Sequence, residues 1–157
     1  MVLLAPRSTP DPLDGLRLED IALPYQCFVQ AGHEVMLASP AGGMPPLRRE
    51  RQGGRAEPEP SSPEVHVRPL LYDTLEVGQV FAEDFLGAFV LTYERAVEDA
   101  DALAVHGLLA TFDAQDKPVV AAGPQAQVLA RIGVVDESCS CDDLGVGAQA
   151  LLARLPR

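Results

Sequence analysis

The sequence predicts an α/β protein with an open, doubly wound, mainly parallel sheet and helices on both faces. Short apolar runs without polar alternation recur along the 157 residues, as in strands buried on both faces of a parallel sheet. Segments with apolar residues about every 3.6 positions separate these runs, which is the pattern of amphipathic helices. Right-handed crossovers between such strands build a sheet whose ligands bind at the carboxyl ends of the strands.

Each element is assigned from its own pattern. The expected strands are residues 2–5, 34–38, 88–91, 118–122 and 134–136. The expected helices are residues 16–31, 97–112, 124–132 and 144–155. Gly32 is expected to end the first helix, and Pro124 suits a first helical turn because its missing N–H would be unpaired there. Residues 65–71 are predicted as an extended edge segment, and residues 73–84 fit either a short helix or a loop.

Length and composition indicate one domain over residues 1–157 with a core of Leu, Val and Ala, since aromatic residues make up only 5% and Trp is absent. Residues 48–63 are rich in Arg, Glu, Gly, Pro and Ser and are predicted to be a mobile insertion. The net charge of -11 argues against nucleic acid and anionic membranes as partners. The apolar run at residues 1–6 is too short to span a membrane, so a cytoplasmic location is expected.

Three cysteines, Cys27, Cys139 and Cys141, form no disulfide framework and are expected to stay reduced. Cys139 and Cys141 form a Cys-x-Cys pair beside two aspartates, which invites a metal or redox interpretation. Structural zinc needs four ligands, and a second pair with suitable spacing is missing from the sequence, so we expect no metal. Cys27 lies near the apolar stripe of its helix and fits a small buried residue better than a nucleophile.

Three stretches of the chain carry a resemblance to a known family. The first comprises residues 15–25 (GLRLEDIALPY), 31–35 (AGHEV) and 38–46 (ASPAGGMPP). The second comprises residues 83–85 (EDF), 89–91 (FVL) and 112–124 (FDAQDKPVVAAGP), and the third residues 134–136 and 144–155. Together they resemble the ThiJ/PfpI superfamily of class I glutamine-amidotransferase-like proteins, in particular its heat-shock-chaperone-like branch.

The resemblance implies a flavodoxin-like sheet, shortened relative to the family, and often a dimer. It also implies a cysteine at a strained strand-to-helix turn, a glutamate on a nearby helix, and a glycine pair that forms an oxyanion hole. A thiolate needs a helix N-terminus and a hydrogen-bonding acid, and a nascent oxyanion needs preorganised N–H donors. These parts would form the family's site.

The chain departs from the family at each of these parts. Residues 117–122 run directly into Gly123 and Pro124, so the family's cysteine and histidine are absent. Thr92, Tyr93 and Glu94 stand where the family has Pro-Gly-Gly, and their side chains would crowd a site that glycine keeps open. The family's glutamate falls on Asp20, whose side chain is one methylene shorter. Between residues 132 and 134 the chain also lacks the segment that carries the family's third catalytic position and later strands.

The sequence leaves a candidate pocket with no catalytic residue assigned. Its residues are Asp20, Thr92, Tyr93, Glu94, Gly123 and Pro124. Asp20 could be a pocket acid or a solvated residue in the first turn of a helix, where negative charge is favourable. Tyr93 and Glu94 could bind a ligand, although a plain polar loop is the favoured interpretation.

The leading functional hypothesis is a catalytically degenerate member with a binding, stress-protection or regulatory role, acting as a homodimer or with an active paralogue and using no cofactor. One alternative is an enzyme of altered chemistry, such as a hydrolase, lyase or deglycase, that pairs Asp20 with Tyr93, Glu94, Cys139 or Cys141. The other is a holdase chaperone, which needs an exposed apolar patch of more than a few hundred Å².

Overall fold

The computed structural model describes residues 2–4, 17–45, 47, 62–92, 100–124, 126–131, 140–141 and 143–156. Its centre is a six-stranded sheet in the order β3-β2-β1-β4-β5-β6. The strands are β1 (Val2–Leu4), β2 (Met36–Ser39), β3 (Leu75–Glu76), β4 (Ala88–Leu91), β5 (Val119–Ala122) and β6 (Ser140–Cys141). Every neighbouring pair in this sheet is parallel. The predicted doubly wound parallel sheet is therefore confirmed.

Without the two-residue edge strand β3, the order β2-β1-β4-β5-β6 is the flavodoxin-like order 2-1-3-4-5. The strand order reverses between β1 and β4: the chain continues from β1 to β2 on one side, and from β4 to β5 on the other. Ligands in such sheets bind outside the carboxyl ends of the strands at this reversal. The fold thus directs attention to the ends of β1 and β4 and to the bend after β5.

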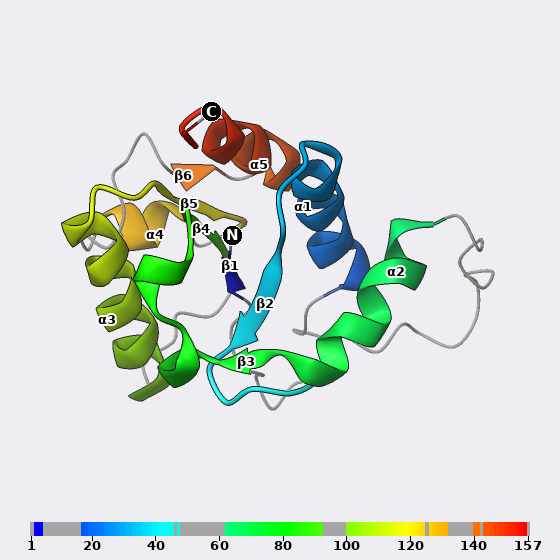
Figure 1. The fold of residues 1–157 in the computed structure, drawn as a ribbon, viewed down its shortest axis with the longest axis horizontal. Coiled ribbons are helices and arrows are strands. Elements are labelled where there is room, and N and C mark those ends of the chain that lie inside the picture. The colour runs from blue at the N-terminus through cyan, green and yellow to red at the C-terminus, as the bar shows by residue number, and fades with distance from the viewer. Residues whose placement is uncertain are drawn as a thin grey trace.

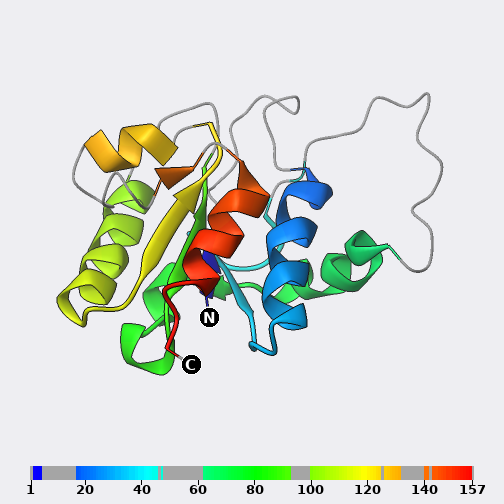
Figure 2. The same ribbon diagram turned by 90° about the horizontal axis from the view of Figure 1, so that it is seen from above.

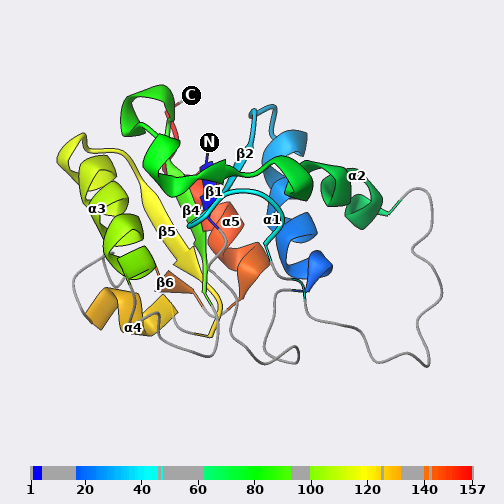
Figure 3. The ribbon, with the colours of Figure 1, turned by 90° about the horizontal axis from the view of Figure 1, so that it is seen from below.

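Helices cover both faces of the sheet. The helices are α1 (Leu18–Gln30), α2 (Pro63–Leu70), α3 (Ala100–Ala114), α4 (Ala126–Arg131) and α5 (Leu144–Leu152). Helices α1 and α5 pack against each other (Figure 1), and Figure 2 shows β5 running between α5 and α3. Helix α2 packs on α1 beyond the edge of the sheet, and α4 contacts β5 and β6 (Figure 3). None of the described helices is long and apolar enough to cross a membrane.

Among the described residues, aromatic side chains pack in a core that consists otherwise of Leu, Val, Ala and Ile21. Phe28 of α1 and Phe89 of β4 are fully buried and meet edge to face with ring centroids 5.5 Å apart. Phe112 of α3 is also fully buried. On α5, a Cβ at Gly147 would lie 2.8 Å from the Cβ of Ala122, so glycine allows the helix to approach the sheet closely.

Residues 71–84, which connect α2 to β4, are built from short 3₁₀ turns. These are η1 (Leu71–Asp73), η2 (Val77–Gln79) and η3 (Ala82–Asp84), with β3 lying between the first two. Val77, Val80 and Ala82 are buried, and α3 packs against η2 and η3. The segment left open between helix and loop thus contains 3₁₀ turns together with a short strand.

Helix α1 ends where the sequence indicated. Gly32 has φ +86°, and its N–H donates to the Val29 carbonyl at 3.0 Å. The N–H of His33 donates to the Phe28 carbonyl at 3.0 Å, which completes the paired hydrogen bonds of a Schellman motif. The predicted helix end at Gly32 is confirmed.

The extended edge segment predicted at residues 65–71 is wrong, because Pro63–Leu70 is the helix α2. Ser62 caps this helix by accepting a hydrogen bond from the Glu64 N–H, and Pro63 occupies its first turn. Residues 62 and 63 therefore belong to a helix start, while residues 48–61 of the predicted insertion lie outside the described residues. The strand predicted at residues 134–136 also lies outside them, and the described strand nearest to it is β6.

Candidate functional site at the carboxyl edge of the sheet

The bend after β5 is the position at which the family resemblance implies a nucleophilic cysteine. Gly123 follows the last residue of β5, has φ +112° and is buried. Its carbonyl accepts the N–H of Ala126 at 3.1 Å, which starts α4. Pro124 is exposed in the turn before that helix. The two described residues of the bend, Gly123 and Pro124, therefore present backbone and a proline ring.

Thr92 closes the space beside this bend. A Cβ at Gly123 would lie 2.5 Å from the Thr92 carbonyl oxygen and 2.9 Å from its Oγ1. The Thr92 side chain is 8% exposed, and its hydroxyl donates to the Ala122 carbonyl at 3.1 Å. The Thr92 N–H donates to the same carbonyl at 2.9 Å. Thr92 and Gly123, both predicted pocket residues, are thus packed directly against each other.

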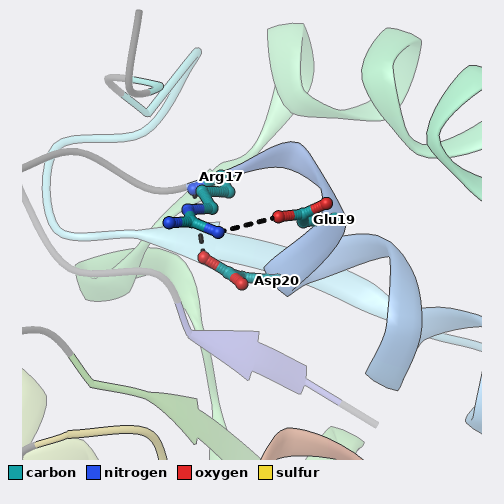
Figure 4. Close-up of polar contacts among 3 residues, drawn as sticks. All are labelled: Arg17, Glu19 and Asp20. Atoms are coloured by element: carbon teal, nitrogen blue, oxygen red, sulfur yellow. Dashed lines mark hydrogen bonds and ion pairs between the residues drawn. The ribbon is translucent and has the colours of Figure 1, made fainter. Parts of the chain in front are cut away.

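Asp20 caps the helix that carries it. It is the third residue of α1, and its Oδ2 accepts the backbone N–H of Arg17 at 3.2 Å (Figure 4). The N–H of Asp20 donates in return to the Arg17 carbonyl at 3.0 Å. The Arg17 guanidinium pairs with Glu19 at 3.1 Å. An acidic group at this position also interacts favourably with the positive end of the helix dipole.

A second carboxylate caps α5. Asp143 precedes this helix, and its Oδ1 accepts the Val146 N–H at 2.8 Å. The start of α5 lies beside α1, since a Cβ at Gly145 would be 3.5 Å from Leu23 Cδ2. Both helices therefore begin with a carboxylate of the chain bonded to a backbone N–H.

The three cysteines differ in what the structure describes of them. Cys27 is partly buried in α1 against the core and makes no disulfide. The backbone of Cys141 in β6 pairs with that of Ala122 in β5, one residue before the bend. Cys139 lies outside the described residues, as do Tyr93 and Glu94. Within the described ranges, no group of three or more His, Cys, Asp and Glu could hold a metal ion.

Sequence analysis missed a buried polar cluster at the carboxyl end of β2. Ser39 and Thr74 are 4% and 7% exposed, and their hydroxyl oxygens are 3.0 Å apart. The Thr74 hydroxyl donates to the carbonyl of Gly43, so its oxygen must receive the proton of Ser39. The N–H of Gly43 donates to the Thr74 carbonyl at 2.9 Å. This cluster ties the exit loop of β2 to the chain entering β3.

Comparisons with known proteins show the fold. Neither the search of protein-family models nor the search of curated proteins produced a match. A ThiJ/PfpI domain protein from Brachyspira murdochii aligns with 98% of this chain and 94% of its own, with a TM-score of 0.57 and 13% identity. Because identity is low, this likeness supports the ThiJ/PfpI fold, and activity does not follow from it.

Two further solved structures have a similar fold. The Rapid Encystment Protein of 24 kDa from Francisella tularensis aligns with 88% of this chain at a TM-score of 0.59 and 10% identity. This chain spans only 63% of the length of that protein. A third solved protein aligns with 99% of this chain and 74% of its own, at a TM-score of 0.62 and 20% identity. The expected flavodoxin-like architecture is confirmed, and it is shared with these solved structures.

Proposed function

We propose that this chain is a catalytically degenerate protein with the ThiJ/PfpI fold that acts by binding, in a stress-protection or regulatory role. The observation that carries the proposal is the contact between Gly123 and Thr92. Real Cβ atoms do not approach other heavy atoms as closely as 2.5 Å, and backbone cannot move aside as a flexible side chain can. Position 123 therefore has no room for a nucleophilic side chain.

The geometry of Asp20 supports the same proposal. Its carboxylate accepts a backbone N–H of its own helix, so turning towards a substrate would break a hydrogen bond that stabilises the start of α1. A general acid or base must be within hydrogen-bond reach of the group it serves. Gly123, the residue at the bend, has no side chain that Asp20 could serve as an acid or base. Asp20 accordingly serves as a structural residue that has kept an acidic side chain.

A turnover assay tests the proposal directly. Purified protein is incubated with methylglyoxal, with glycated thiols and with glutamine, and loss of each compound is compared with the buffer reaction. We expect no difference between protein and buffer. Asp20→Ala is measured beside Glu19→Ala, a matched control from the same helix turn, and circular dichroism verifies that both variants are folded. Turnover that is lost in Asp20→Ala and kept in Glu19→Ala would refute the proposal.

One observation favours an enzyme of altered chemistry as a second candidate. The β5–β6 register sets Cys141 opposite Ala122, so a cysteine stands on the strand next to the bend. Cysteine is a residue type that covalent catalysis uses as a nucleophile, which makes Cys141 the candidate for a displaced one. Its test is alkylation by iodoacetamide followed by peptide mass spectrometry, with Cys27 as the internal reference. Preferential labelling of Cys141, and turnover lost in Cys141→Ser but kept in Cys27→Ser, would establish this candidate.

The binding role implies a partner, and we propose a second copy of this chain or an active paralogue. The support is the resemblance to the ThiJ/PfpI superfamily, whose members often form dimers. Sedimentation velocity at several concentrations measures self-association. A species of twice the chain mass supports the homodimer, whereas a monomer at all concentrations would contradict it and leave the paralogue as the partner to seek by co-expression.

A further inference from the structure

We draw no further inference here: the strongest candidate, the exposed apolar face of α3 formed by Leu103, Ala104, Gly107 and Ala110, carries none because nothing in the described part of the chain shows what covers it.

Discussion

Replacing Gly123 by alanine tests whether position 123, in the bend after β5, is closed to every side chain. The substitution adds one methyl group, which would lie 2.5 Å from the Thr92 carbonyl oxygen at a residue with φ +112°. Backbone strain in a region that L residues rarely adopt costs about 1–3 kcal/mol. Overpacking against neighbours that cannot move costs about 1–3 kcal/mol more. We therefore expect Gly123→Ala to lower the free energy of unfolding by about 2–6 kcal/mol.

Two other glycines separate the contributions of strain and contact. Gly32 also has positive φ, +86°, but a Cβ there meets nothing within 4 Å, so Gly32→Ala isolates the strain. We expect it to cost about 1–2 kcal/mol. Gly107 lies within α3 with open space around it, so Gly107→Ala has neither penalty. It should stabilise the protein by about 0.5–1 kcal/mol because alanine loses less backbone entropy on folding.

Urea unfolding followed by circular dichroism measures all three variants. With a slope of about 2 kcal/mol per M, the Gly123→Ala midpoint should fall by roughly 1–3 M. The Gly107→Ala midpoint should rise by a few tenths of a molar unit. The reasoning fails if Gly123→Ala costs no more than Gly32→Ala, because the contact with Thr92 would then add nothing to the strain.

Five further substitutions test the cap of α1, the buried hydroxyl pair and the aromatic core. Asp20→Ala removes a helix cap and should lower the free energy of unfolding by about 1 kcal/mol and the melting temperature by about 2–4 °C. Glu19→Ala should change the free energy of unfolding by less than about 0.5 kcal/mol. Equal melting temperatures for the two variants would contradict the capping role of Asp20. Thr74→Val should lower the free energy of unfolding in urea by about 1–3 kcal/mol, because it leaves the Ser39 hydroxyl and the Gly43 carbonyl without their hydrogen-bond partner. Ser39→Ala keeps the hydrogen bond from Thr74 to Gly43 and should lower it by less. A larger loss in Ser39→Ala than in Thr74→Val would overturn the assigned direction of the Ser39–Thr74 hydrogen bond. Phe89→Ala should cost about 3–5 kcal/mol, and a smaller loss would show that α1 collapses onto the sheet.

The central strands could be predicted from the sequence because a strand buried on both faces is a continuous run of apolar residues. Residues 88–91 were expected as a strand, and β4 covers the same four residues, all of them buried. The last strand could not be placed in this way. Strand β6 has two residues, Ser140 and Cys141, and such a short segment carries no periodic pattern.

The wrong prediction of an extended segment at residues 65–71 has a specific cause. Val65, His66, Val67 and Arg68 alternate apolar and polar residues, which is the pattern of a half-buried strand. The buried residue of α2 is Val67, and the next buried residue, Leu71 at the start of η1, follows four positions later, which is equally a helical spacing. The deciding signals were the cap at Ser62 and the proline after it. Both fell at the end of the segment interpreted as an insertion.

The candidate site shows where sequence reasoning stops. The absence of a cysteine before Gly123 could be read from the sequence, but the contact between Thr92 and Gly123 joins residues far apart in the chain. It depends on the register that pairs Leu91 with Ala122, and no local pattern encodes that register. For Asp20 the sequence allowed a pocket acid and a first-turn residue. Only the hydrogen bond to Arg17 shows that the carboxylate caps the helix.

The closed bend also links two positions, the residue after β5 and the residue after β4, that look independent in the sequence. A side chain at Gly123 needs space on the β4 side, and Thr92, in the family's Pro-Gly-Gly stretch, fills that space with its carbonyl and its hydroxyl. The hydroxyl in turn is fixed by the Ala122 carbonyl, the last residue of β5 before the bend. Removing the threonine side chain alone would leave its carbonyl 2.5 Å from any Cβ at Gly123. A side chain at Gly123 would therefore require the exit of β4 to move, which supports the proposal of a binding role made above.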